Sequence, residues 1–218
     1  MQLVWKRSLA LAAAIALTVL AAPVSAVPIT VVNNSFELPA QADGGFTNGV
    51  VAGWVAFGAT GVFNPTVGQL SQGPTDGLQV GYSNNVGLAL TQDLTATLMA
   101  NTLYTLMVDI QSRTDGSPNQ STTLQLRTAA DAILASATFG PLAGGLNQVL
   151  TATFAAGAFD PNIGQFLKIA LIAGGVQSDW DNVRLDASPQ GTGSVPEPGT
   201  LLLLGSALIG LRMLRRNS

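Results

Sequence analysis

The sequence predicts an all-β protein, a β-sandwich of two antiparallel sheets, on three observations. Between the two ends of the chain, short runs rich in β-branched, aromatic and leucine residues are separated by Gly, Asn, Asp and Pro. Several of these runs alternate apolar and polar residues with the period of two that suits a strand with one buried face. The runs also recur at regular spacing, which is typical of sandwiches and barrels.

The expected strands follow from these patterns in chain order. Residues 103–110 (LYTLMVDI) are almost continuously apolar, as in a central strand buried on both faces. In the last strand, Val183 and Leu185 are expected to face the core, and Trp180, by its parity, to point outward. The other expected strands cover residues 28–36, 88–94, 122–127, 149–154 and 166–172.

The first 26 residues predict a secretory signal peptide with a signal helix. Lys6 and Arg7 precede an apolar run over 9–22, and Val24 and Ala26 then supply the small residues at −3 and −1 of a cleavage site. Signal peptidase is expected to cut after Ala26. An uncleaved N-terminal anchor is the alternative.

The other end of the chain predicts a short transmembrane helix over residues 200–214. The stretch 201–211 carries no charge and is followed by Arg212, Arg215 and Arg216. Such a helix is about 22 Å long, which is short for a bilayer but sufficient if the arginines reach the headgroups. Arginines there favour a cytoplasmic C-terminus, which places the middle of the chain outside the inner membrane.

A sorting motif precedes this helix. Val195, Pro196, Glu197 and Pro198, followed by an apolar helix and a basic tail over 195–218, resemble the PEP-CTERM sorting signal. The resemblance implies processing by an exosortase, with transient anchoring in the inner membrane and then release or transfer to the cell surface or the extracellular space. A permanent C-terminal anchor is the alternative.

Composition sets limits on the middle of the chain. A β-sandwich domain is expected over 27–187, and a Gly-rich linker over 188–194 follows it. From 27 to 194 the chain has eleven acidic and four basic residues, which argues against a nucleic-acid partner. Without cysteine it forms no disulfide, and without histidine it has no Ser-His-Asp or Cys-His mechanism.

A second resemblance concerns the domain itself. Asn33-Asn34-Ser35-Phe36-Glu37, Gly53-Trp54, and Trp180-Asp181-Asn182-Val183-Arg184-Leu185, in this order, resemble the galactose-binding-like jelly roll of carbohydrate-binding modules. The resemblance implies a jelly-roll sandwich with a structural calcium ion at Glu37 and Asp181. Calcium prefers carboxylate and carbonyl oxygens. The alternative is that both are ordinary acids at turns and strand ends.

Three function classes follow, of which a non-enzymatic matrix protein is preferred. It is an exported, exosortase-sorted surface or extracellular-matrix protein associated with exopolysaccharide. The first alternative is a calcium-dependent carbohydrate-binding module, and the sugar-binding candidates are Trp180, Tyr82, Asn84 and Arg184. The lesser alternative is a glycan-active enzyme with a carboxylate pair drawn from Asp109, Asp115, Asp179 and Asp181.

Tyr104 and Trp54 are expected in the core, and Lys168 is expected on a strand with a solvated amine.

Overall fold

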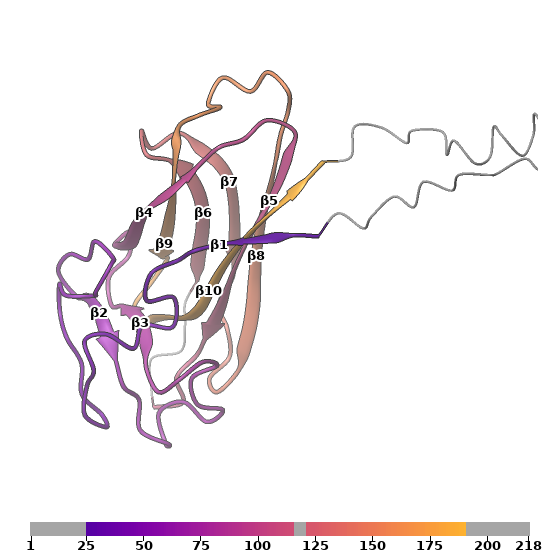
Figure 1. Cartoon of the computed structure of the whole chain (residues 1–218). Helices are drawn as coiled ribbons and strands as arrows, with labels where there is room; N and C mark the ends of the chain where they lie inside the picture. Colours follow the sequence, from indigo (N-terminus) through magenta and orange to yellow (C-terminus); the bar gives the residue numbers. More distant parts are fainter. Residues whose placement is uncertain (1–24, 116–120, 191–218) are drawn as a thin grey trace, which may run out of the picture. The chain divides into compact units, whose positions relative to one another are not determined.

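The computed structural model describes residues 25–115 and 121–190, which form a β-sandwich of two antiparallel sheets (Figure 1). This confirms the predicted fold class. Across the described residues, no helix has the length and apolar character needed to cross a membrane. The expected signal helix, the sorting motif and the helix over 200–214 lie outside these residues.

The larger sheet has six strands in the order β2-β3-β10-β5-β8, with β1 also paired to β10. Strand β10 lies at its centre, because it pairs with β3 and β1 on one side and with β5 on the other. It extends two residues into the predicted linker. The strands are β1 (Val27–Ile29), β2 (Thr60–Phe63), β3 (Val80–Ser83), β5 (Thr102–Gln111), β8 (Asn147–Ala156) and β10 (Ser178–Pro189).

The smaller sheet has four strands in the order β4-β9-β6-β7. Leu124 and Leu126 of β6 face the core and are fully buried, as the alternation predicts. The strands are β4 (Ala89–Thr97), β6 (Thr122–Thr128), β7 (Ile133–Phe139) and β9 (Phe166–Ala173).

One main hydrophobic core joins the two sheets. Trp54 and Tyr104 are buried in it, which confirms their predicted positions. The Phe36 and Trp54 rings pack at 5.2 Å between centroids, and the Trp54 indole N–H donates to the Val32 carbonyl at 3.0 Å. The loop before β2 is thereby fixed over one end of the core.

The prediction that Trp180 points outward is wrong. Trp180 is fully buried in the core, together with Val183 and Leu185. The register of β10 against β5 shifts between Asp181 and Arg184, where Asn182 has a φ of 49°. This β-bulge adds a residue, so Trp180 and Val183 share a face although an odd number of positions separates them.

The close approach of the two layers at β3 gives a stability prediction. A Cβ at Gly81 would lie 2.8 Å from Phe36 ring atoms and 3.0 Å from Leu90 Cδ1. We expect Gly81→Ala to lower the free energy of unfolding by about 1–3 kcal/mol, because overpacking forces core side chains to move. Denaturant unfolding measures this. The matched control is Gly140→Ala, where a Cβ would meet no atom within 4 Å. Equal stability of the two variants would contradict the packing.

Candidate functional site

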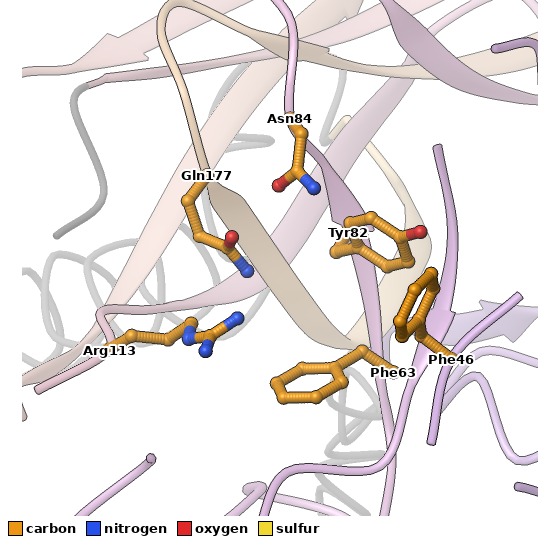
Figure 2. Close-up of a pocket in the computed structure, with 6 residues that line it drawn as sticks. All are labelled: Phe46, Phe63, Tyr82, Asn84, Arg113 and Gln177. Atoms are coloured by element: carbon orange, nitrogen blue, oxygen red, sulfur yellow. The ribbon is translucent and has the colours of Figure 1, made fainter. Parts of the chain in front are cut away.

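A pocket with three aromatic side chains lies on the face of the larger sheet that is turned away from the main core. It has a volume of about 100 Å³. Figure 2 shows its lining residues, which come from the ends of strands and from loops far apart in sequence: Phe46, Phe63, Tyr82, Asn84, Arg113 and Gln177. We call this the ring pocket.

The aromatic wall of the ring pocket is fixed by Tyr82 of β3. Its ring makes edge contacts with Phe46 and Phe63, with centroids 6.3 and 6.4 Å apart. Its hydroxyl donates to the Thr47 carbonyl at 2.7 Å and lies 2.6 Å from Asn48 Oδ1. Burial, with a smaller effect of Asp179, raises the pKa of Tyr82 to about 12. Tyr82 therefore stays a neutral phenol at physiological pH.

A guanidinium forms the opposite wall. Arg113, just after β5, lies with its central carbon 4.8 Å from the centre of the Phe63 ring, which is a cation–π contact. Its Nε donates to Asp115 Oδ1 at 2.7 Å, and its Nη2 pairs with Asp115 Oδ2. The hydrogen bond to Asp115 raises the pKa of Arg113 further and lowers the pKa of Asp115.

A fully buried carboxyl lies beside the pocket. Asp179 of β10 is the ladder partner of Tyr82 on β3, so the two side chains leave the sheet on the same face. Asp179 Oδ1 accepts a hydrogen bond from the Nε2 of the lining residue Gln177 at 2.9 Å, and Oδ2 has no partner. Burial raises the pKa of Asp179 to about 7.

Asn84 gives the pocket an acceptor without a partner. Its side chain lines the pocket, and its Oδ1 is buried without a hydrogen-bond partner. Buried polar atoms are normally satisfied, so such an atom in a pocket is suited to a ligand N–H or O–H.

The predicted sugar-binding residues separate in the structure. Tyr82 and Asn84 both line the ring pocket. Trp180 is in the core. Arg184 forms an ion pair with Asp109, with Nη2 2.8 Å from Oδ1, and is not among the lining residues of this pocket. An aromatic platform with all four residues is therefore not formed.

Glu37 and Asp181, the predicted calcium ligands, hold the same loop. Glu37 Oε1 accepts from the backbone N–H groups of Leu78 and Gln79, at 2.8 and 2.9 Å. Asp181 Oδ2 accepts from Thr75 Oγ1 and from the Asp76 N–H, at 3.0 and 2.8 Å. Burial raises the pKa of Asp181 to about 7 despite these hydrogen bonds. Oxygens that face N–H donors are poorly placed for a cation, so the pair as arranged does not fit calcium well.

Within residues 25–115 and 121–190, no three acidic side chains converge as a metal centre would need. The calcium ion stays a prediction.

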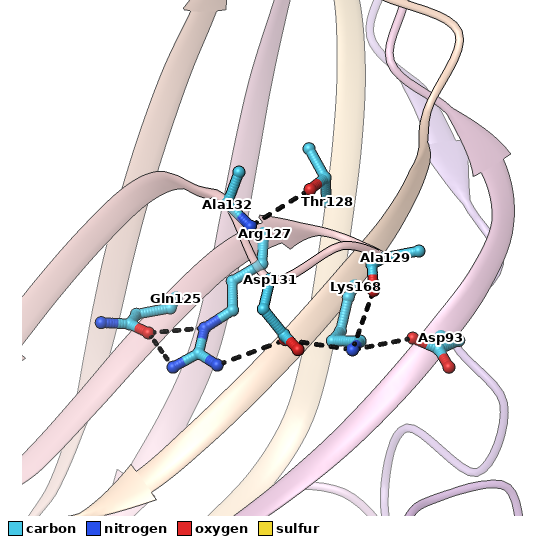
Figure 3. A network of polar contacts seen from close by, with 8 residues as sticks. All are labelled: Asp93, Gln125, Arg127, Thr128, Ala129, Asp131, Ala132 and Lys168. Carbon is cyan, nitrogen blue, oxygen red and sulfur yellow. Dashed lines mark hydrogen bonds and ion pairs between the residues drawn. The ribbon is translucent and has the colours of Figure 1, made fainter. Parts of the chain in front are cut away.

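A second polar cluster lies on the smaller sheet and is structural (Figure 3). Lys168 of β9 reaches Asp131 at 3.0 Å, Asp93 at 3.5 Å and the Ala129 carbonyl at 3.3 Å. The hydrogen bond from Lys168 lowers the pKa of Asp131. These contacts fasten the β6–β7 turn to β9, so Lys168 is not free to act as a base.

Sequence reasoning missed most of the ring pocket. It did not single out Phe46, Phe63 or Arg113, and it considered Asp179 only as one of four acids for a carboxylate pair. The available signal in the sequence was an acid directly before Trp180, at the start of the last expected strand.

The comparisons with known proteins concern the whole domain and the tail. None of the curated proteins is a significant match. The C-terminal residues 194–217 match the PEP-CTERM protein-sorting motif, which confirms that resemblance and implies exosortase-dependent export to the surface or extracellular space. The HpiC1-like family, described as HpiC1 cyclase, matches residues 27–186.

Solved cyclases are similar to the chain over nearly their whole length. A cyclase from Fischerella sp. TAU is 28% identical, with a TM-score of 0.68 over 77% of this chain and 100% of that one. The same organism's Stig cyclase FisC, bound to (3Z)-3-(1-methyl-2-pyrrolidinylidene)-3H-indole, is 27% identical, with a TM-score of 0.66 over 76% and 99%. A cyclase from Fischerella sp. TAU in complex with 4-(1H-indol-3-yl)butan-2-one is 28% identical, with a TM-score of 0.67 over 76% of this chain and 100% of that one.

These matches overturn the expectation that the protein is not an enzyme, because the matching family and the similar structures are cyclases. The match to that family runs through the β-sandwich from its first strand into its last. The chain belongs to the HpiC1-like cyclase family.

Proposed function

We propose that the chain is an exported cyclase in which Asp179 transfers a proton to a small aromatic substrate held in the ring pocket. The proposal rests on one observation: a buried carboxyl with an unpartnered Oδ2 lies beside a pocket with three aromatic side chains. Because the pKa of Asp179 is raised to about 7, much of it stays protonated at neutral pH. A general acid works best with a pKa near the working pH.

The chemistry is a proton-promoted ring closure. Asp179 donates its proton to a π bond of the substrate, which leaves a cation. A second π bond of the same molecule attacks this centre and forms the ring bond, and the Asp179 carboxylate accepts the proton that is then lost. The product is an isomer of the substrate, and no oxidant or co-reactant is consumed.

The walls of the pocket suit a cationic intermediate. Aromatic faces attract cations, and Phe63 already carries the guanidinium of Arg113 at 4.8 Å. Tyr82 is a wall and not a base, since its pKa of about 12 keeps its proton in place. The pocket volume of about 100 Å³ approaches that of an engineered cavity of about 150 Å³ that binds benzene.

Two of the similar cyclase structures contain indole-containing ligands, which supports an aromatic substrate here. A sugar is the second candidate ligand, because Tyr82 and the unfilled acceptor of Asn84 lie in the same pocket. In that case the protein is a surface protein associated with exopolysaccharide, delivered by the same sorting motif.

Binding of a defined probe tests the pocket. We expect 4-(1H-indol-3-yl)butan-2-one to bind the purified protein and Phe46→Ala to weaken it roughly tenfold, because one aromatic wall is lost. Phe46 is 60% exposed, so the fold tolerates the change. Calorimetry measures the binding. The control is Phe57→Ala, because Phe57 is 68% exposed and lies outside the pocket, so its loss removes a surface ring without changing the pocket wall. Binding of exopolysaccharide that is lost in Phe46→Ala, with no binding of the probe, would favour the sugar.

The raised pKa of Asp179 gives a pH prediction. From pH 4 to 7 the unfolded chain gives up this proton while the folded protein keeps it, so stability falls as pH rises. We expect Asp179→Asn to be more stable than the parent protein at pH 8, nearly equal at pH 4, and inactive as a cyclase. Urea unfolding at both pH values measures the difference. The exposed Asp43→Asn is the control, and identical pH profiles of Asp179→Asn and the parent would contradict the assignment.

Calcium at Glu37 and Asp181 is tested by melting. An ion that binds only the folded chain raises the melting temperature, and removing it lowers that temperature. We compare the melting temperatures of the parent protein and of Glu37→Gln, each in calcium and in chelator. If the parent melts at the same temperature in both solutions, the calcium prediction is wrong and the two acids only hold the loop over 75–79.

A further inference from the structure

Exposed apolar side chains gather at the end of the sandwich opposite the ring pocket. Phe159 is 98% exposed, Met99 62% and Phe166 54%, and Ile163 is exposed as well. They lie in the β4–β5 loop, in the β8–β9 loop and at the start of β9. We call these four residues the exit patch. Large side chains exposed together mark an interaction surface more often than a chance arrangement.

The exit patch is built on ordered backbone. The Leu98 N–H donates to the Gln165 carbonyl, and the Gly164 N–H donates to the Leu98 carbonyl, both at 2.9 Å. Asp160 Oδ1 accepts from the Asn162 N–H at 2.8 Å and closes the turn beside Phe159. The two loops are thus joined, and Phe159 is held away from the core at their tip.

An apolar groove of about 480 Å³ opens beside Met99. It runs between β1, β4, β5 and the end of β10, and none of its lining side chains is charged. Val27, Ile29, Ala96 and Pro189 are among its apolar walls. The groove extends the apolar surface of the exit patch inward between the two sheets.

The chain leaves the domain at this same end. The Gln190 N–H donates to the Asn101 carbonyl at 2.7 Å, so the last described residue is fastened to the β4–β5 loop. The sorting motif begins four residues later, at 194, and the uncharged stretch over 201–211 follows. Ten extended residues span at most about 36 Å, so a membrane-inserted tail keeps the exit patch near the bilayer.

We propose that the exit patch is a membrane-docking surface that inserts Phe159 and Met99 into the lipid bilayer while the chain is held by its tail. The occupant is the apolar boundary of the bilayer and not a charged headgroup. The loops 98–101 and 157–165 contain one charged residue, Asp160, and no basic one. Attraction to anionic lipid therefore contributes nothing, and docking depends on burial of apolar surface.

Site-specific labelling tests this proposal. Because the natural chain has no cysteine, Phe159→Cys and Val67→Cys each carry a single environment-sensitive fluorophore. Val67 is 94% exposed and lies in the β2–β3 connection at the pocket end, so it is the matched control. The full chain is reconstituted in phosphatidylcholine vesicles. We expect the label at 159 to shift to the blue and to be quenched by lipid-attached quenchers, in low salt and in 1 M salt, with the label at 67 unchanged.

Two results overturn the proposal. A label at 159 that stays as water-exposed as the label at 67 shows that the exit patch does not reach the bilayer. A blue shift that appears without vesicles shows that protein covers the patch. If that shift grows with protein concentration the cover is a second copy, and otherwise it is the chain's own tail. Neither result depends on cyclase activity, so this test and that of the ring pocket fail independently.

Discussion

The β-bulge of β10 between Asp181 and Arg184 is the constraint on which the core and the pocket both depend. Strand β10 pairs with three strands, so the direction of its side chains sets both faces of the larger sheet. The extra residue, Asn182, lets Trp180 and Val183 enter the core together. The Val183 N–H, freed from the regular ladder, donates to the Asn34 carbonyl at 2.9 Å. The bulge therefore combines a continuous core on one side with buried acids on the other.

Three carboxylates on this outer face have different environments. Asp109 forms an ion pair with Arg184, and Asp181 accepts hydrogen bonds from the loop over 75–79. Asp179 has one hydrogen bond from Gln177 and one empty oxygen. An unsatisfied buried polar atom costs about 1–3 kcal/mol, which a fold tolerates where the atom is needed. That contrast is why we propose Asp179, and not its neighbours, as the proton donor.

The sequence predicted what depends on local pattern. Alternation and apolar runs identified β4, β5, β6, β8, β9 and β10 and the inward positions of Leu124 and Leu126, whereas β2, β3 and β7 were not expected. The tail motif was readable because it is contiguous. Trp180 was misplaced because a bulge breaks the period of two, and nothing in the surrounding residues marks it. The ring pocket was missed because Phe46, Phe63 and Arg113 are brought together only by the pairing of β2, β3, β10 and β5. The expectation that the protein is not an enzyme was wrong for a similar reason, since the raised pKa of Asp179 depends on its burial, which the sequence does not show.

The two functions that we propose involve opposite ends of β10. Asp179 lies at its beginning beside the ring pocket, and Pro189 lies at its end beside the apolar groove. The two residues are ten positions apart along the strand, which is about 33 Å. Because β10 is paired on both sides at its beginning, the ring pocket is held at a fixed place in the sandwich relative to the end of the strand. If the exit patch docks as we propose, the ring pocket faces away from the lipid, and a substrate of the proposed cyclase reaches it from the aqueous side.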